Sequence, residues 1–275
     1  MIIFWSRGDA DHNMDESILT ELGAIIAQHP WWHARGHLVV ALLRRLGVDR
    51  SAAILEAGCG WGTNLTLLEN AGYTVTGLDI SRRAMERLDR ADRTFIEADL
   101  TQEPPPGAGK YDVVLALDVI EHIDDDGAAV GRLARLIRPG GFLILSVPAL
   151  PGLYSEFDTV QGHRRRYTPD SLRAAMENSG LLEISTIFWW GQWMAWILGR
   201  RKSASRARPG DTSADIYKKY LALPPWPGSL LMRALFMLDH RRTLARRNTT
   251  GTSLFAIATC PEQAPAPAVH RTDDA

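Results

Sequence analysis

Short apolar runs alternate with longer stretches of helical periodicity between residues 52 and 147. The run Tyr111–Leu117 is almost continuously apolar, which is typical of a strand covered on both faces. This alternation indicates right-handed crossovers, and therefore an α/β fold with a doubly wound parallel sheet. Ser81 is placed to cap a helix, and Pro139-Gly140-Gly141 to form a turn. The pattern predicts strands at residues 53–57, 74–80, 94–98, 111–117 and 142–147, and helices at 64–71, 82–93 and 127–137.

Two further β-like runs, 182–189 and 253–259, flank a basic, aromatic and helix-prone stretch. The last fifteen residues, PEQAPAPAVHRTDDA, are rich in Pro and Ala and poor in large apolar side chains, which predicts a disordered tail. The expected organisation is an N-terminal extension with lid helices (1–50), a core (51–190), a helical insertion (191–250), a closing strand (251–260) and the tail (261–275).

The N-terminus shows no secretory signal, because its five apolar residues lack a basic flank and soon turn acidic. Met14 is a candidate start, with residues 1–13 as an upstream extension. The most apolar long stretch, Leu181–Leu198, is interrupted by Glu183 and Gln192, so we expect no membrane-spanning helix.

Overall charge and cysteine content narrow the class of protein. The 275 residues include 31 Lys and Arg against 32 Asp and Glu, and the net charge of −1 gives no global case for nucleic acid binding. The two cysteines, Cys59 and Cys260, form neither a disulfide framework nor a metal motif, which fits a reducing cytoplasm. The charge is uneven, however: residues 1–150 hold 14 basic and 21 acidic side chains, whereas 191–250 hold 12 basic and three acidic ones.

A glycine-rich loop, Leu55-Glu56-Ala57-Gly58-Cys59-Gly60-Trp61-Gly62-Thr63-Asn64, follows the first predicted core strand and opens a helix. Gly58, Gly60 and Gly62 lack the Cβ atoms that would block close approach of a ligand to the backbone. A dinucleotide fingerprint has G-x-G-x-x-G, but here the third glycine position holds Thr63.

Carboxylates accompany this loop. Asp79, 17 residues after Gly62, ends the second predicted strand and can accept hydrogen bonds from two ribose hydroxyls. Asp99 ends the third strand, where it can receive an adenine amino group, and Glu56 can face a cationic amino-acid tail. With no P-loop lysine, these residues favour an adenosine ligand carrying little phosphate.

The motifs LEAGCGWGTN, GLDIS, EADL, YDVVLALDVIEHI and RPGGFLILSVP occur in the order found in class I S-adenosylmethionine-dependent methyltransferases, and residues 52–189 resemble that family. The resemblance implies a seven-stranded sheet whose last strand, 253–259, is antiparallel. It also implies that the core binds S-adenosylmethionine and releases S-adenosylhomocysteine. Asp79 would hold the ribose, Asp99 and Leu100 would border the adenine, and Asp118 would lie beside the methionine moiety. The other expected cofactor residues are Glu56, Gly58, Gly60, Gly62, Asn64 and Ile80.

Methyl transfer needs alignment and, for a hydroxyl acceptor, removal of a proton. His163, in a loop beyond the fifth strand, is the first candidate base, with Asp158 to orient it. The alternative is a structural loop in which Thr168 caps the next helix ahead of Pro169.

The second candidate is Asp118-Val119-Ile120-Glu121-His122, which is similar to the E-x-x-E-H motif of ubiquinone-pathway O-methyltransferases. That resemblance implies a divalent cation held by Asp118, Glu121 and His122, but we do not favour a metal here. The alternative is that Asp118 contacts the cofactor while Glu121-His122 caps the following helix. His33 and His37 are four positions apart and could bind a metal, but no third ligand lies nearby in the sequence. We therefore interpret this stretch as a lid helix whose neighbouring tryptophans cover the cofactor or acceptor site.

The insertion is basic and contains an apolar stripe at helical spacing: Leu230, Leu231, Ala234, Leu235 and Leu238. This pattern is compatible with three roles. The helix could pack in the core and expose a basic face to solvent, or it could contact a membrane or an amphiphilic acceptor. The third role is binding of nucleic acid. Nucleic acid is disfavoured because the chain has neither a D/N-P-P-Y/F motif after the fourth strand nor a Pro-Cys nucleophile.

The overall interpretation is O-methylation of a small or amphiphilic molecule, natural-product or lipid-linked, by a cytoplasmic enzyme. Membrane contact through residues 191–250 is one of the alternatives left open for the insertion. The alternatives are N- or C-methylation of a small molecule, an RNA or protein methyltransferase, a non-catalytic cofactor-binding module, and a nicotinamide oxidoreductase. The G-x-G-x-G spacing disfavours the oxidoreductase.

Overall fold

A computed structural model describes residues 1–6, 18, 21–88, 92–106, 108–200, 208, 210–223, 225 and 227–262, apart from the side chains of 196 and 198–200. Met14 and nearly all of the predicted tail lie outside these residues. So do several basic residues of the insertion and the side chains of Trp196 and Trp226.

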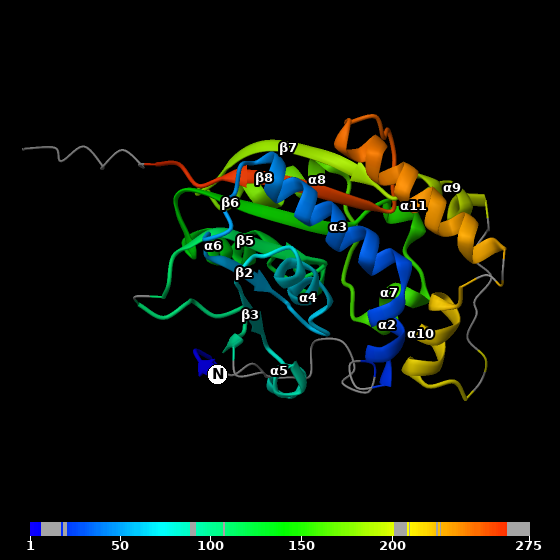
Figure 1. Cartoon of the computed structure of the whole chain (residues 1–275), viewed down its shortest axis with the longest axis horizontal. Coiled ribbons are helices and arrows are strands. Elements are labelled where there is room, and N and C mark those ends of the chain that lie inside the picture. The colour runs from blue at the N-terminus through cyan, green and yellow to red at the C-terminus, as the bar shows by residue number, and fades with distance from the viewer. Residues whose placement is uncertain are drawn as a thin grey trace, which may run out of the picture.

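The strands form one sheet in the order β1-β4-β3-β2-β5-β6-β8-β7 (Figure 1). All neighbouring strands are parallel except β8, which runs antiparallel to both β6 and β7. The predicted doubly wound sheet with an antiparallel last strand is therefore confirmed. The strands are β1 (Ile2–Phe4), β2 (Ile54–Ala57), β3 (Val75–Asp79), β4 (Thr94–Glu97), β5 (Tyr111–Leu117), β6 (Ile137–Pro148), β7 (Glu183–Trp190) and β8 (Ser253–Thr259).

Two features differ from the expected seven-stranded sheet. Residues 2–4, assigned above to the N-terminal extension, form an eighth strand, because the run Ile-Ile-Phe pairs in parallel with the edge strand β4. Pro139-Gly140-Gly141 lies within β6 and makes no separate turn. The strand is irregular there, with Gly140 at φ 75° and a shift in register between Tyr111 and Val113 of β5.

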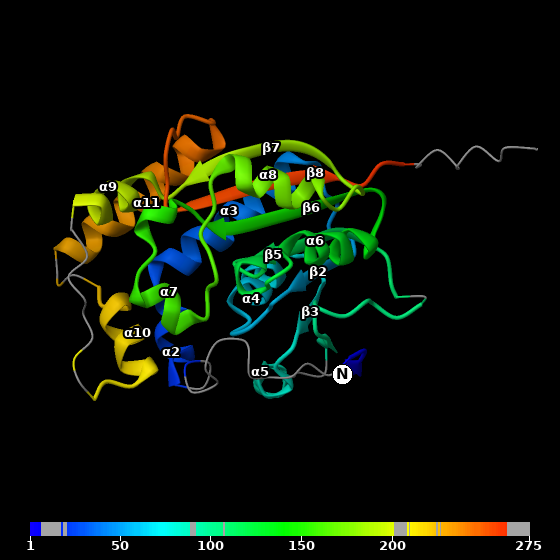
Figure 2. The ribbon, with the colours of Figure 1, turned by 180° about the vertical axis from the view of Figure 1, so that it is seen from behind.

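Helices cover both faces of the sheet. In Figure 1, α3 and α4 lie in front of the strands, whereas Figure 2 shows α6 and α8 on the opposite face. The helices are α2 (Gly23–Gln28), α3 (Pro30–Arg45), α4 (Thr63–Asn70), α5 (Arg82–Leu88), α6 (Asp126–Arg135), α7 (Glu156–Gln161), α8 (Pro169–Glu177), α9 (Gln192–Arg200), α10 (Ser213–Leu221) and α11 (Gly228–Leu244).

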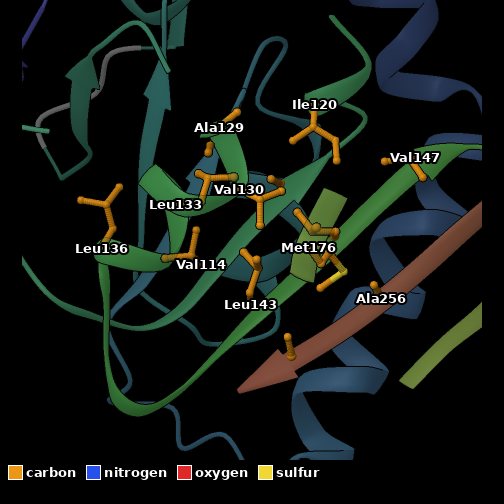
Figure 3. Packing of buried hydrophobic residues seen from close by; sticks show 14 of the residues in the cluster. Val114, Ile120, Ala129, Val130, Leu133, Leu136, Leu143, Val147, Met176 and Ala256 are labelled. Atoms are coloured by element: carbon orange, nitrogen blue, oxygen red, sulfur yellow. The ribbon is translucent and has the colours of Figure 1, made fainter. Parts of the chain in front are cut away.

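Each face of the sheet carries its own hydrophobic cluster, because side chains alternate along a strand. Figure 3 shows Val130 and Leu133 of α6 and Met176 of α8 packed with Val114 of β5 and Leu143 of β6. The opposite face joins β-strand residues to α3, α4 and Met85 of α5, together with Phe236 of α11. Both faces of the central strands are therefore buried, as the continuously apolar run in β5 predicts.

Local sequence signals fix where several helices begin. The Thr168 side chain accepts a hydrogen bond from Ser171 N–H and Pro169 occupies the first turn of α8, as predicted. Ser81 Oγ likewise accepts a hydrogen bond from Ala84 N–H at the start of α5. The caps of α8 and α5 follow directly from residues next to the helix, which is why the sequence indicates them.

The described residues of the insertion between β7 and β8 include the helices α9, α10 and α11, as the helix-prone composition predicts. α11 packs against α3 and β7, and α10 packs against α7. Among the helices that the structure describes, none combines the length and the apolar character needed to cross a membrane.

Candidate active site

A cavity of about 1960 Å³ opens at the carboxyl ends of β2, β3, β4 and β5, where ligands bind in doubly wound sheets. Its walls combine the glycine loop, the ends of the strands, the loop around His163 and the helices of the insertion. We call the part beside the glycine loop the cofactor end, and the part lined by α9, α10 and α11 the acceptor end.

The three glycines of the loop all have left-handed backbone conformations, with φ 70° at Gly58, 42° at Gly60 and 68° at Gly62. A Cβ at Gly58 would lie 2.5 Å from Val119 Cγ2. Gly58 and Gly60 line the cavity, whereas Gly62 is the N-cap of α4 and packs under Leu88. Two of the three glycines are therefore placed to admit a ligand, and the third shapes the turn.

Asp79 is fixed at the end of β3 by backbone donors. Gly60 N–H and Ser81 N–H donate to its two carboxylate oxygens at 2.8 and 2.9 Å. Burial raises the pKa of the Asp79 carboxyl, an effect that these two bonds partly oppose. The glycine loop and Asp79, the residue expected to hold the ribose, thus form one unit facing the cavity.

Asp99 and Leu100, the residues expected to border an adenine, line the cavity together with Ile80. Asp99 Oδ1 accepts a hydrogen bond from Thr101 N–H at 2.8 Å, and Asp99 N–H donates to Ser6 Oγ at 2.9 Å. The segment that follows β1 therefore supports this corner of the cavity.

Glu56 and Asn64 form a buried polar pair beneath the loop. Asn64 Nδ2 donates to Glu56 Oε1 at 2.7 Å, but Glu56 Oε2 and Asn64 Oδ1 have no hydrogen-bond partner among the described residues. Burial raises the pKa of Glu56 to about 7, with the Asn64 hydrogen bond and Arg35 opposing the rise. Two unpaired buried acceptors at the cavity wall fit a cationic group such as the ammonium of an amino-acid ligand.

Arg35 of α3 is a cavity residue that the sequence analysis did not identify. Its guanidinium forms an ion pair with Asp118 and lies over the Trp31 ring, 4.7 Å from the centroid. Asp118 has φ 58°, unusual for a residue other than glycine, and also accepts a hydrogen bond from Ser146 Oγ at 3.0 Å. The spacing of four between Trp31 and Arg35 was the available signal for a shared helix face.

His163, Asp158 and Arg166 form a chain of hydrogen bonds. His163 Nδ1 lies 3.0 Å from Asp158 Oδ1, and Arg166 donates to both Asp158 oxygens at 2.7 and 3.1 Å. Burial alone would raise the pKa of Asp158, but the bonds from His163 and Arg166 lower it below its ordinary value. His163 and Arg166 line the cavity, whereas Asp158 lies behind them. The predicted His163–Asp158 pair is thus brought together.

A second cluster contains Glu121, His122 and His163, each with a ligand atom within 4.8 Å of the others. Both Glu121 oxygens and His122 Nδ1 have no hydrogen-bond partner among the described residues. Burial, followed by the nearby Asp118, raises the pKa of Glu121, and burial together with His163 lowers that of His122 to about 3.

This cluster differs from the metal set considered above, because His163 stands where Asp118 was expected. The alternative that Glu121-His122 caps the next helix is wrong: Asp125 is the N-cap of α6, accepting from Ala128 N–H at 2.9 Å. His33 and His37 belong to no such cluster within the described residues, and His33 Nε2 is bonded to the Ala27 carbonyl.

The acceptor end is apolar and aromatic. Trp31 and Trp32 at the start of α3 line the cavity, in agreement with the predicted lid helix, whereas Leu38, Leu42 and Leu43 farther along α3 are buried in the core. Phe157 of α7 stacks on Tyr220 of α10, with ring centroids 4.9 Å apart. No described Lys or Arg of the insertion lines the cavity. The insertion residues that do are Met194, Ile197, Tyr217, Tyr220, Leu221, Ala222, Leu223, Gly228, Leu231, Met232, Leu235 and Phe236.

Comparison with known proteins places the chain among methyltransferases. A family model described as a methyltransferase domain matches residues 31–185. A ubiquinone biosynthesis O-methyltransferase from Escherichia coli is 29% identical over 158 residues, 51% of this chain and 64% of the relative. The chain thus covers less than two thirds of the length of the curated relatives it matches.

Two solved structures share the fold. A chain of the complex between the Haloferax volcanii Trm112 methyltransferase activator and the putative methyltransferase has a TM-score of 0.54 and 18% identity, covering 90% of this chain and all of that one. A putative sarcosine dimethylglycine methyltransferase from Galdieria sulphuraria has a TM-score of 0.52 and 15% identity, covering 84% and 86% of the two chains.

Proposed function

Because this chain belongs to the methyltransferase-domain family and has the class I fold that uses S-adenosylmethionine, we propose that it transfers a methyl group to an oxygen atom of an amphiphilic acceptor. The observation that carries the proposal is that His163, held by Asp158 from behind, lines the same cavity as the glycine loop. A positioned base matters most for a neutral hydroxyl, which must lose a proton as it is methylated.

The cofactor end fits S-adenosylmethionine. Glu56 Oε2 and Asn64 Oδ1, both buried and unpaired among the described residues, would receive the ammonium. Asp79 would receive the ribose hydroxyls through its remaining lone pairs, and Asp99 would meet the adenine. When bound, the cofactor supplies an electrophilic methyl on a sulfonium that leaves as a neutral thioether.

His163 would take the acceptor proton at Nε2. Its Nδ1 faces Asp158, which fixes the tautomer with the proton on Nδ1 and stabilises the imidazolium that forms. Arg166 holds Asp158 ionised and in place. As the acceptor oxygen accepts the methyl group, its proton would pass to His163 Nε2, and the cofactor would be left as the neutral thioether.

The acceptor end supports an amphiphilic molecule. Ordinary small-molecule pockets measure roughly 300–1,000 Å³, and the cavity here, at about 1960 Å³, has room for a second ligand beside the cofactor. The walls contributed by α9 and α11 include Met194, Met232, Leu235 and Phe236. An amphiphilic acceptor would place its hydroxyl near His163 and its apolar portion against α9 and α11.

A metal-assisted mechanism is the second candidate, because the Glu121 oxygens and His122 Nδ1 are buried without hydrogen-bond partners among the described residues, and Glu121 Oε1 lies 3.8 Å from His163 Nε2. Glu121, His122 and His163 would hold a divalent cation, which would lower the pKa of the acceptor hydroxyl. His163 Nε2 cannot serve as ligand and base at once. Activity abolished by EDTA and restored by Mg²⁺ or Zn²⁺ would favour the metal, and activity unaffected by EDTA would favour the base.

The proposal is tested by label transfer from methyl-labelled S-adenosylmethionine to a catechol, to the same catechol carrying a prenyl chain, and to a matched prenylated aniline. We expect O-methylation, with a preference for the prenylated catechol. Methylation of the aniline alone would reject an oxygen acceptor. Calorimetry with S-adenosylhomocysteine and with NAD is the parallel measurement: binding of NAD alone would overturn the cofactor assignment. Binding of S-adenosylhomocysteine without transfer to any acceptor would favour a non-catalytic module.

A further inference from the structure

Helix α11 buries two polar side chains and leaves four large apolar ones exposed. Its buried side chains are Phe236, Asp239 and Thr243. Four large apolar side chains are exposed instead: Leu230 (61%), Leu231 (61%), Met237 (62%) and Leu238 (45%). Helix α6 shows the usual arrangement, with its apolar residues buried in the core. We refer to these four residues of α11 as the α11 face.

A buried carboxylate fixes this orientation of the helix. Asp239 accepts hydrogen bonds from Gly191 N–H at 2.7 Å, Gln192 N–H at 3.1 Å and Asn248 Nδ2 at 3.1 Å. Turning α11 to bury its apolar side would break all three bonds and leave a buried carboxylate unpaired, which is costly. The apolar side chains therefore stay on the outside of the protein.

The charges around the α11 face have one sign. Arg233 and Arg241 are exposed on the helix, and Arg246 and Arg247 are exposed just beyond it. Asp239 is the one acidic residue between positions 227 and 250, and it is buried. An apolar helix face bordered by arginines is the pattern of helices that lie in the headgroup region of an anionic bilayer.

The α11 face is also continuous with the acceptor end of the cavity. Leu231 and Leu223, the latter just before the helix, are both exposed, and both also line the cavity. Figure 1 shows α11 at the outer edge of the molecule, beside α9 and in front of the end of β7. A molecule leaving a bilayer at this face would reach the acceptor end without crossing water.

We propose that the α11 face, with Arg233 and Arg241, docks on the surface of an anionic lipid bilayer. A bilayer fits better than a second copy, since two such faces pressed together would bring their arginines into contact with one another. Docking at this position gives an amphiphilic acceptor a route from the membrane into the cavity.

Flotation of the full chain with lipid vesicles tests the proposal without cofactor or acceptor, so its outcome is independent of the proposed methyl transfer. We expect binding to vesicles of phosphatidylcholine and phosphatidylglycerol that weakens with salt, and much weaker binding to phosphatidylcholine alone. The triple variant Leu230→Ser/Met237→Ser/Leu238→Ser should lose at least about tenfold in affinity. None of these three residues lines the cavity, so binding of S-adenosylhomocysteine should persist and report correct folding.

A matched control removes exposed apolar side chains elsewhere: Phe4→Ser/Leu181→Ser, at positions 58% and 37% exposed. This control should float like the unaltered protein. Arg233→Gln/Arg241→Gln should remove most of the preference for anionic vesicles. The proposal is overturned if the protein floats with neither vesicle, or if the triple variant floats like the unaltered protein. It is also overturned if gel filtration shows a dimer that the triple variant abolishes, since the α11 face would then cover a second copy.

Discussion

The two ends of the cavity are built in different ways. At the cofactor end, backbone geometry and buried carboxylates within short stretches of chain set the shape, as in the pairing of Asp79 with Gly60 and Ser81. At the acceptor end, apolar side chains from α3, α7, α9, α10 and α11 meet across long sequence distances. The cofactor end therefore requires particular residues at particular spacings, whereas the acceptor end requires only a suitable apolar surface.

The largest effect is expected at the proposed base. His163→Ala should lower kcat by roughly 10²–10⁴-fold, the range for a lost general base, while the Kd for S-adenosylhomocysteine changes little. Steady-state kinetics and calorimetry measure the two quantities. His33→Ala, at a histidine outside the cavity, serves as the control and should leave kcat unchanged. An unaltered kcat in His163→Ala would reject His163 as the base.

Asp79→Ala tests whether the cofactor end depends on one carboxylate. Loss of two hydrogen bonds from ribose hydroxyls to a charged acceptor should weaken binding of S-adenosylhomocysteine by about 100-fold. Asp79→Asn keeps one acceptor oxygen and should lose less. Calorimetry gives both constants, and equal, small losses in the two variants would show that Asp79 does not hold the ribose.

At the acceptor end the double variant Met232→Gln/Leu235→Gln should raise KM for an apolar acceptor by about thirtyfold, because two apolar contacts are lost. The Kd for S-adenosylhomocysteine should stay the same. If the Kd for S-adenosylhomocysteine rises as much as the KM for the acceptor, the two ends of the cavity do not bind their ligands independently.

The smallest expected effect concerns pH. Burial raises the pKa of Glu56 to about 7 in the free protein, above its ordinary value. A cationic ligand favours the ionised carboxylate, so binding releases a proton and affinity should rise with pH until about 7 and then level off. Between pH 6 and 8 the gain is at most about tenfold. Calorimetry at several pH values measures it; Glu56→Gln should bind more weakly and without this dependence, and a Glu56→Gln variant that keeps the dependence would assign it to another group.

The sequence predicted the features that depend on neighbouring residues. The glycine loop, Asp79 and the caps of α5 and α8 each follow from residues within a few positions or at a fixed strand–helix spacing. The pairing of His163 with Asp158 was predicted for the same reason, since only five positions separate them.

Contacts between distant segments were not predicted. Arg35 and Asp118 are 83 positions apart, and nothing in either local pattern selects the other. His163 joins Glu121 and His122 because the loop after β6 folds back over the end of β5, which depends on the packing of the whole sheet. The orientation of α11 also escaped prediction, because its helical periodicity does not reveal that Asp239 is the buried residue.

The left-handed backbone at Asp118 bears on any attempt to make this protein more robust. A non-glycine residue at φ 58° costs about 1 kcal/mol or more, and here the ion pair with Arg35 and the bond from Ser146 accompany it. Asp118→Gly would relieve that strain but also remove the carboxylate at the cavity wall. It would also leave the buried Arg35 guanidinium without its partner, which costs more than the strain that is relieved. Selection for heat resistance should therefore keep Asp118 just as selection for turnover does.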